Sequence, residues 1–585
     1  MKRRFLFLII ICLSLSMNSC INDFLDRKPL DVISEDDVWG NANAIQAYMA
    51  GMYDNVFVEH HDWQLNAGFF SHYTDEAMRS YSWGAPYSPT FGDNYIEQWE
   101  YSKIRKVNEF IENIPYATIE EPLKEQFLAE AYYLRAFNYF VMAKRYGGVP
   151  LIKEAQQYDG SNIEELRVPR NTEDETWLFI AEDLDRAITA LPESYDATNQ
   201  YRATKYAAYA LKSRAMLYAG SISRYGNVQL NGLVGIPKDK ADSYFSSSLA
   251  ASEAIIQSGH YALYEKEADK AANFQQLFLD QSMHEEAIYV KAFSVPDKAH
   301  SFDYYNAAPS FKIDWGTNTS PTLELVEEFE YTDGRKGTLE INDASGNPIY
   351  YDNADDIFKD KDPRFFATIL YPNSPWQGNV LEVRRGIIGS DGVKVEGSAF
   401  TDKFPEDESY TVSGKDGLVM QGDCSRTGFY IKKYMDPTNR LESSRSWQNF
   451  LVFRYAETLL NYAEAAMELN RPDEALSKLN EVRKRAGVKE KTSITMEDIR
   501  HERRVELAFE NLRYWDLVRW RTATNVMNNT QFSALIPWLD FKTKKYIFEK
   551  GPNTLNLSKT FLEKNYYQPI PGVNQNEQLI QNPGF

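Results

Sequence analysis

The sequence predicts a mainly α-helical protein, in which a frame of tetratricopeptide-like helical hairpins carries a loop-rich insert with a few short strands. Three observations support this fold class. Much of the chain places apolar residues at helical spacing. Residues 451–486 carry two such helices joined by a short turn, as in a tetratricopeptide repeat. Residues 293–444, by contrast, hold clusters of Gly, Asp, Asn, Pro and Ser between short apolar runs.

The first residues have the pattern of an export signal. Basic residues at positions 2–4 precede an apolar run at 5–15, which is shorter than the ~20 residues of a membrane span and suits a signal peptide. Ser19 and Cys20 follow, and a small residue before a cysteine at this place resembles a bacterial lipobox. We therefore expect residues 1–19 to be a lipoprotein signal peptide and Cys20 to be acylated. The alternative is an ordinary signal peptide with an incidental cysteine.

The next part of the chain contains three predicted helical units. Their expected boundaries are 96–114 paired with 123–146, 173–190 paired with 203–219, and 241–258, whose partner helix the sequence does not identify. Small alanines alternate with Tyr, Leu and Phe along 123–146, which lets two helices pack closely. Gly147 and Gly148 should stop this helix before Pro150.

The insert and the C-terminal part contain further predicted elements. Short apolar runs at 386–388 and 428–431 are expected to form strands. After the insert, 451–469 and 472–486 form the clearest hairpin, and 499–520 is expected to be one more helix. Because the spacing between hairpins is irregular, a regular solenoid is not expected.

The 499–520 helix has a distinctive arrangement of charges. Its apolar residues fall on one face, and they are Val505, Ala508, Phe509, Leu512 and Trp515. Opposite charges lie three residues apart on the other faces, in the pairs Arg503/Glu506, Glu510/Arg513 and Asp516/Arg519. So many Arg and Glu residues beside Phe and Trp usually form bidentate ion pairs that hold a fold together. We interpret these charges as structural and not as a site of chemistry.

Composition narrows the classes of function. Loss of residues 1–19 removes three of the 64 basic residues and leaves 61 against 84 acidic ones, a net charge of −23, which argues against a nucleic-acid partner. Cys424 would be the only unmodified cysteine left, so no disulfide within the chain is expected. The chain has no metalloprotease, serine-hydrolase or P-loop motif. We therefore expect no enzymatic activity, no cofactor and no metal site.

Five segments carry a resemblance to a known family, in addition to the 499–520 stretch. They are DFLDRKPLDVISEDDVW after Cys20, FLAEAYYLRAFNYFVMAKRYGGVPLI, DPRF at 362–365, FLVFRYAETLLNYAEA and the closing YYQPIPGVNQNEQLIQNPGF. In this order they closely resemble the SusD/RagB family of surface lipoproteins, which bind nutrients for a TonB-dependent outer-membrane transporter. The resemblance covers nearly the whole chain.

The resemblance implies a fold, a location and a partner. The fold would be a tetratricopeptide-type helical scaffold packed against an irregular lobe. The protein would be exposed on the cell outer membrane, held there by a lipid on Cys20, and would capture an oligosaccharide or polysaccharide as a lid over a SusC-like transporter. The SusD-like domain would span 20–585. We divide it into 20–95 with a candidate ligand loop, the hairpins of 96–292, the insert 293–444, and 445–585 with the last hairpin and the family signature.

Two loops offer the mixture of aromatic faces and polar groups that a sugar requires, and sites in related proteins draw on broadly these two regions. The candidates in the first loop are Arg79, Tyr81, Trp83, Tyr87 and Asn94. Those in the second are Asp303, Tyr304, Tyr305 and Trp315, with Asn306 and Asn318 nearby. Trp83 and Trp315 are the strongest individual candidates, and Trp63 and Trp376 are the alternatives.

Other interpretations remain open at this level. The same lid role could serve a peptide or another nutrient, since aromatic loops suit either. A surface lipoprotein hydrolase and a helical scaffold without a small ligand are further alternatives. His60 and His61 are adjacent and lack the spacing of helical metal ligands, and the acidic run 352–362 fits a solvated loop better than a calcium site.

Overall fold

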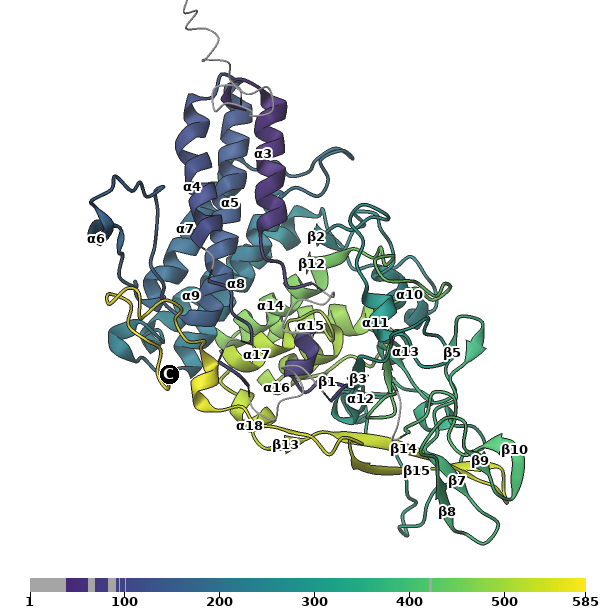
Figure 1. Cartoon of the computed structure of the whole chain (residues 1–585). Helices are drawn as coiled ribbons and strands as arrows, with labels where there is room; N and C mark the ends of the chain where they lie inside the picture. Colours follow the sequence, from purple (N-terminus) through teal and green to yellow (C-terminus); the bar gives the residue numbers. More distant parts are fainter. Residues whose placement is uncertain (1–37, 61–68, 83–90, 94, 100, 420–422) are drawn as a thin grey trace, which may run out of the picture.

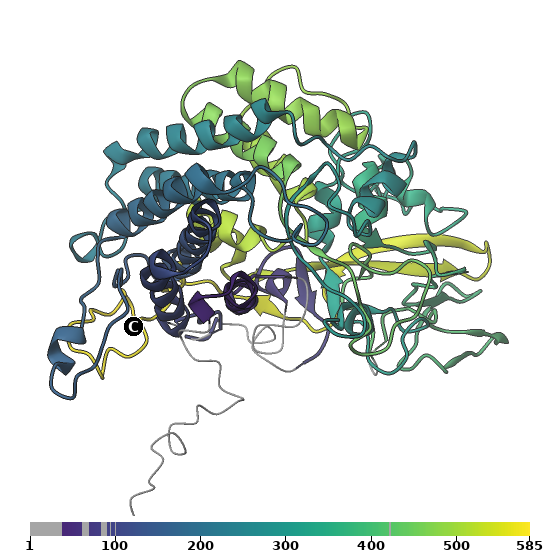
Figure 2. The same cartoon turned by 90° about the horizontal axis from the view of Figure 1, so that it is seen from above.

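The computed structural model describes residues 38–60, 69–82, 91–93, 95–99, 101–419 and 423–585. Within them the chain is mainly α-helical, as predicted. The long helices form a frame on one side of the molecule, and most of the strands lie in an irregular lobe on the other side (Figure 1). Viewed from above, the frame curves around the centre of the molecule (Figure 2).

The α-helices of the described chain range in length from four to 26 residues. In chain order the α-helices are α3 Ala42–Asn55, α4 Tyr101–Asn113, α5 Glu121–Tyr146, α6 Ile163–Leu166, α7 Glu173–Ala190, α8 Lys205–Tyr225, α9 Ala241–Ser258, α10 Lys270–Leu277, α11 Phe302–Asn306, α12 Leu323–Glu328, α13 Pro363–Thr368, α14 Tyr455–Glu468, α15 Pro472–Ala486, α16 Met496–Glu506, α17 Arg513–Arg519 and α18 Ala523–Met527.

The strands are short and form several small sheets. They are β1 Ala77–Arg79, β2 Ala287–Lys291, β3 Thr319–Pro321, β4 Ile369–Leu370, β5 Pro375–Trp376, β6 Asn379–Val380, β7 Gly386–Ile388, β8 Lys394–Glu396, β9 Lys403–Phe404, β10 Asp407–Thr411, β11 Tyr430–Ile431, β12 Phe450–Arg454, β13 Thr530–Gln531, β14 Ser533–Asp540, β15 Lys545–Pro552 and β16 Ser558–Lys559. The largest sheet among the described residues has the order β15-β14-β7-β8, and the others are two-stranded pairs. The strand predicted at 386–388 is confirmed as β7, whereas only the end of 428–431 forms β11.

The long helices pack in the order in which they occur in the chain. α4 packs on α5, α5 on α7, α7 on α8 and α8 on α9. The insert then intervenes, and the stack resumes with α9 on α14 and α14 on α15. The helix at 241–258, whose partner the sequence left open, therefore lies between α8 and α14. One continuous apolar core runs through the frame and the lobe.

Specific residues fix the ends of these helices. α5 ends at Gly147, whose positive φ of 74° ordinary side chains rarely adopt. The next residue, Gly148, lies so close to the following segment that a Cβ there would be 2.1 Å from the carbonyl oxygen of Asn171. α7 begins with a capping box, in which Thr172 Oγ1 accepts from the Glu175 amide and Glu175 accepts from the Thr172 amide.

Several helix predictions are wrong in their extent: the helix expected at 96–114 begins at Tyr101, and the one expected at 203–219 runs from Lys205 to Tyr225. The helix expected from 451 begins at Tyr455, because Phe450–Arg454 forms β12 and pairs with β2; its aromatic and β-branched residues favour a strand. The helix expected at 499–520 is interrupted between α16 and α17. There Phe509 and Asn511 both have a φ of 61°, and the Phe509 amide donates to Glu76 at 3.2 Å instead of to a carbonyl of its own helix.

The charges of the 499–520 stretch lie in the core and bind partners from distant segments. Glu506 accepts from Arg364 at 2.8 Å, from Arg454 at 2.7 Å and also from Arg485. Glu510 binds Arg454 through both oxygens, at 2.7 Å each. Only Asp516/Arg519 of the three predicted pairs forms, at 2.9 Å. The structural interpretation of these charges is confirmed, but most of the expected partners are wrong, because Glu506 and Glu510 face arginines that other elements bring into the core.

Candidate functional site

The two loops that the sequence singled out are joined by a two-stranded antiparallel sheet. β1 pairs with β3 in the register Ala77 to Pro321, Met78 to Ser320 and Arg79 to Thr319. The two strands lie side by side near the centre of the molecule (Figure 1). The pairing continues past the strand ends, where the Ser80 amide donates to the Asn318 carbonyl at 3.0 Å. The residues that follow β1 and those that precede β3 therefore leave the same end of this small sheet side by side.

Tyr81 and Trp315 come into direct contact at this point. Their rings meet edge to face, with centroids 5.9 Å apart and an interplanar angle of 61°. The Tyr81 hydroxyl donates to the Gly316 carbonyl at 2.5 Å, which fixes its ring against the second loop. Trp315 remains 46% exposed. The pair therefore presents an indole ring to solvent on a rigid support.

Two further candidates, Tyr304 and Tyr305, adjoin the second loop through the backbone bond between Tyr305 and Asn318. They lie on α11, are half-buried, and meet edge to face with centroids 5.4 Å apart. The Tyr305 carbonyl accepts from the Asn318 amide at 2.9 Å, so α11 is bonded to the residue just before β3. We call Tyr81, Tyr304, Tyr305 and Trp315 the aromatic patch.

Close backbone contact holds the two sides of the patch together. A Cβ on Gly316 would lie 2.3 Å from the Ala307 carbonyl oxygen, so only glycine fits there without movement. The next amide, that of Thr317, donates to the same carbonyl at 2.9 Å. The chain just after Trp315 is thus fastened to the end of α11.

Asp303 is not placed on the exposed surface. Its carboxylate is buried and accepts from the Asp436 amide at 2.6 Å and from the Gln448 side chain at 3.1 Å. Burial raises the pKa of Asp303 to about 6. The expectation that it offers a free carboxylate to a ligand is therefore wrong. Asp303 connects α11 to residues 436–448 and supports the patch from behind.

Arg79 is also buried, as the last residue of β1. Its guanidinium carbon lies 5.9 Å from the centroid of the Tyr81 ring, so the charge faces the inner side of the patch. Burial lowers the pKa of Arg79 to about 10. The sequence assigned it to an exposed loop, and the pairing of β1 with β3 explains why its side chain is enclosed instead.

The remaining candidates divide into two groups. Trp83, Tyr87, Asn94, Cys20 and the alternative Trp63 lie outside the described residues. Trp376, the other alternative, is 4% exposed and so offers no ring face to a ligand.

Polar groups adjoin the patch. Lys312 and Asp423 form an ion pair at 2.8 Å, and Asp423 contributes to raising the pKa of Tyr81, after burial, to about 12. No local sequence signal predicts this ion pair, because Asp423 follows the second loop by more than a hundred residues.

Asn318 lies fully buried behind the patch, and within the described chain neither atom of its side-chain amide forms a hydrogen bond. A buried amide in this state costs about 1–3 kcal/mol, and because no part of Asn318 is exposed it presents no group to a ligand at the surface of the patch.

Over the described residues, no three His, Cys, Asp or Glu side chains gather as ligands for an ion. A search of the same residues finds no helix with the length and apolar character of a bilayer span.

Comparison with known proteins gives the family. The SusD/RagB model, described as the SusD family, matches residues 285–585, more than half of the chain. The chain belongs to the SusD/RagB family. A second model, described as starch-binding proteins associating with the outer membrane, matches residues 23–217 of this SusD/RagB protein.

Individual relatives agree with this assignment. A SusD-like protein of Bacteroides ovatus is 23% identical over 98% of this chain and 96% of its own length. A crystal structure of a SusD-like protein from Bacteroides fragilis has a TM-score of 0.71 and 25% identity, covering 96% of this chain and 100% of the other. A laminarin-binding SusD-like protein has a TM-score of 0.61 and 20% identity, covering 93% and 100%. The family resemblance read from the sequence motifs is thereby confirmed.

Proposed function

We propose that this SusD/RagB protein is a non-catalytic binding protein that captures oligosaccharides at the aromatic patch. The observation that carries the proposal is the Tyr81–Trp315 pair, which holds an exposed indole in a fixed orientation. Sugars present flat C–H faces that stack on such rings, and hydroxyls that need charged or amide partners. The Lys312–Asp423 ion pair supplies such partners beside the rings. The laminarin-binding relative supports the same class of ligand.

The location and the partner follow from the family and from the N-terminal pattern. A lipid on Cys20 would hold the protein in the outer membrane with its body exposed on the surface. From there it would deliver captured sugar to a SusC-like TonB-dependent transporter and close over it as a lid. Capture and closure then amount to a shift between open and closed states that the ligand biases. The match to outer-membrane-associated proteins supports this location.

A peptide or another nutrient is the second candidate ligand. Exposed rings next to an ion pair also suit a peptide with aromatic and charged side chains. The lid role would be the same. A surface hydrolase is a less favoured alternative, because the sequence has no metalloprotease, serine-hydrolase or P-loop motif.

Calorimetric titration of the purified protein against plant, host and microbial oligosaccharides tests the proposal. We expect saturable binding of at least one sugar with no product formed. Binding accompanied by product would favour the hydrolase. If no sugar gives a binding signal and peptides do, the second candidate would be established. Co-purification with a SusC-like transporter from the producing cells tests the lid role separately.

A further inference from the structure

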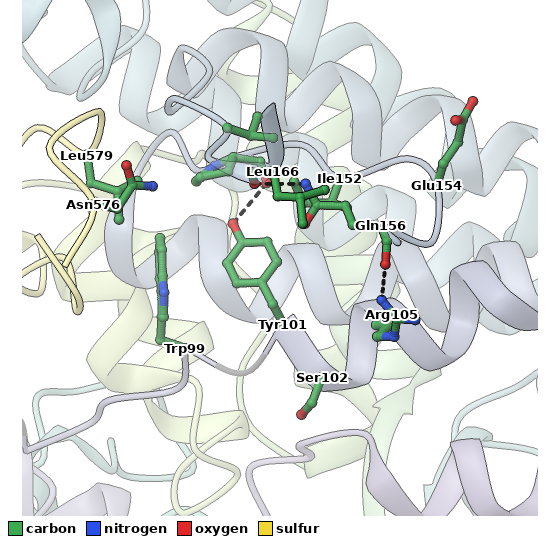
Figure 3. Close-up of a pocket in the computed structure, with 12 residues that line it drawn as sticks. Trp99, Tyr101, Ser102, Arg105, Ile152, Glu154, Gln156, Leu166, Asn576 and Leu579 are labelled. Carbon is green, nitrogen blue, oxygen red and sulfur yellow. Dashed lines mark hydrogen bonds between the residues drawn. The ribbon is translucent and has the colours of Figure 1, made fainter. Parts of the chain in front are cut away.

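A second cavity lies in another part of the molecule and shares no lining residue with the aromatic patch. Its volume is about 330 Å³. It is enclosed by the start of α4, by the segment 150–168 and by residues of the C-terminal segment near 576–579 (Figure 3). Three segments far apart in the sequence therefore contribute to one cavity.

Two aromatic rings form one wall and are held in place by their neighbours. Trp99 meets Tyr101 edge to face at 5.2 Å, and it meets Tyr146 in the same way at 4.9 Å. The Tyr101 hydroxyl donates to the Pro150 carbonyl at 2.8 Å, which fixes the second ring. Figure 3 shows Ile152 and Leu166 across from these rings. The cavity thus has a rigid aromatic wall and an apolar side, as binding sites for compact ligands usually have.

Polar groups at the rim are each oriented by one internal hydrogen bond. Gln156 Nε2 donates to the Leu166 carbonyl at 2.9 Å, and Asn576 Oδ1 accepts from the Gln578 amide at 3.0 Å. The opposite ends of these amides, Gln156 Oε1 and Asn576 Nδ2, form no hydrogen bond with any residue that the structure describes, and neither does the Trp99 indole N–H. One hydrogen-bond acceptor and two donors around the aromatic wall are therefore available to a ligand.

This chemistry selects a class of ligand. An apolar group in the cavity would cover the three polar atoms without satisfying them, which is unfavourable. A pyranose ring offers both a C–H face for an aromatic wall and hydroxyls that donate and accept at its edge. Arg105, which donates to the Gln156 carbonyl, and the exposed Glu154 extend the polar rim outward. The volume of about 330 Å³ is at the small end of ligand pockets, so a longer sugar chain would extend past the rim.

We infer that the Trp99 cavity is a second saccharide-binding site, which takes one sugar residue of a chain and works independently of the aromatic patch. The inference rests on the proposed function only for the class of ligand. Its consequence is that the protein holds a glycan at two separate places.

The test uses the protein labelled with 5-fluorotryptophan and observed by ¹⁹F NMR. The chain has 11 tryptophans, and Trp99→Phe and Trp315→Phe identify the two resonances of interest. Maltohexaose, laminarihexaose, cellohexaose and xylohexaose are the probes. We expect at least one of them to shift the Trp99 resonance saturably, in the unmutated protein and equally in Trp315→Ala. The Trp315 resonance reports the aromatic patch in the same titration.

A matched pair of substitutions in the C-terminal segment isolates the polar contact. Asn576→Asp retains the acceptor for the Gln578 amide and removes the donor that faces the cavity. Asn574→Asp makes the same change on an exposed residue that does not line the cavity. We expect Asn576→Asp to weaken binding reported by Trp99 at least tenfold, and Asn574→Asp to leave it unchanged. Both should leave binding reported by Trp315 unchanged.

The outcomes separate this inference from the proposed function. A shift of the Trp315 resonance alone would overturn the second site and leave the proposed function standing. A Trp99 shift that disappears in Trp315→Ala would overturn the independence of the cavity. Equal weakening by Asn576→Asp and Asn574→Asp would overturn the assigned polar contact. If no probe shifts either resonance, both the inference and the proposed function fail for these glycans.

Discussion

Tyr81 and Trp315 lie edge to face with their ring centroids 5.9 Å apart. In the sequence, their two loops are separated by the helices α4 to α10. The contact exists because β1 pairs with β3 and carries the two loops out of the same small sheet. The hydrogen bond from Tyr81 to Gly316 then fixes the geometry. Rings held in this way have little freedom to lose if a ligand binds them, which would favour affinity at the proposed site.

Removing the exposed indole should weaken glycan binding without unfolding the protein. We expect Trp315→Ala to raise Kd at least tenfold, or about 1.4 kcal/mol, because the ring face is lost. Its effect on stability should stay within about 0.5 kcal/mol, because half of the side chain is already in solvent. Calorimetry and thermal unfolding measure the two effects. Tyr116→Ala removes a ring that is 82% exposed and outside the patch, and should change neither quantity. Unchanged affinity in Trp315→Ala would place the site elsewhere.

The backbone contact between Gly316 and Ala307, which joins Trp315 to the end of α11, should also be sensitive to substitution. In Gly316→Ala the added Cβ must displace the Ala307 carbonyl, which lies 2.3 Å from its position. We expect a loss of about 1–3 kcal/mol in the free energy of unfolding, together with weaker glycan binding. Chemical denaturation and calorimetry measure these changes. Gly51→Ala is the control, since a Cβ there meets nothing within 4 Å and alanine favours the helix α3. A Gly316→Ala protein as stable as this control would contradict the proposed tight contact.

The buried charges around Glu506 should matter for stability and not for binding. Burial alone would raise the pKa of Glu506, but Arg485, Arg454 and Arg364 hold that pKa well below its usual range. Glu506→Gln leaves these guanidinium groups partly unpaired in the core. We therefore expect a loss of about 3–5 kcal/mol in the free energy of unfolding, measured by chemical denaturation.

Glu497→Gln, on the same helix, is the control for this prediction. Its side chain is exposed and, among the residues that the structure describes, pairs only with Arg500, at 3.0 Å, so we expect a change within about 0.5 kcal/mol. Because the pKa of Glu506 is lowered by folding, the stability that it contributes should be lost as the pH falls below the usual range of a carboxyl group. Equal effects of the two substitutions would mean that the buried network contributes no more than a surface pair.

Glu76 should cause the opposite pH dependence. Burial, and then the Asp75 carboxylate, raise the pKa of Glu76 to about 8. In the unfolded chain an ordinary glutamate has a pKa of about 4.3, so between these values the folded protein holds a proton that the unfolded chain has released. This group therefore destabilises the fold progressively as the pH rises through that window, by at most about 1.4 kcal/mol per pH unit.

The substitution Glu76→Gln should remove this dependence. The glutamine retains an acceptor for the Phe509 amide and cannot ionise. We expect the melting temperature of the variant to rise relative to the unmutated protein between pH 5 and pH 8, as followed by calorimetry in a series of buffers. A constant difference across this range would show that Glu76 does not titrate there.

The proposed anchor depends on one thiol. In Cys20→Ser there is no sulfur to acylate, so we expect the protein to lose its label from radioactive palmitate and to leave the membrane fraction. Fractionation of the producing cells and gel autoradiography measure both effects. Cys424→Ser is the control, because that thiol is buried, and it should keep both the label and the location. A Cys20→Ser protein that still takes up the label would point to another acylation site.

Much of the fold could be predicted because the helices depend on local patterns. The apolar periodicity of 173–190 and 241–258 predicted α7 and α9, and Gly147 predicted the end of α5. The errors arose where a distant partner overrides the local pattern. The β2 strand draws 450–454 into β12, and Glu76 takes the Phe509 amide out of the helical pattern.

The sequence by itself determined the family, the helical frame and the two loops that carry the aromatic patch. The frame and the loops depend on the order of residues within single segments, and the family depends on several such segments in sequence order. Tertiary structure alone decided that Arg79 and Asp303 are enclosed while Trp315 is exposed, and that Asp423 stands beside Tyr81. It also decided that Glu506 binds Arg364, Arg454 and Arg485. Glu506 does not bind Arg503, which lies three residues earlier in the same helix. Burial and ion pairing are set by segments that meet only in the folded chain, so no local pattern records them.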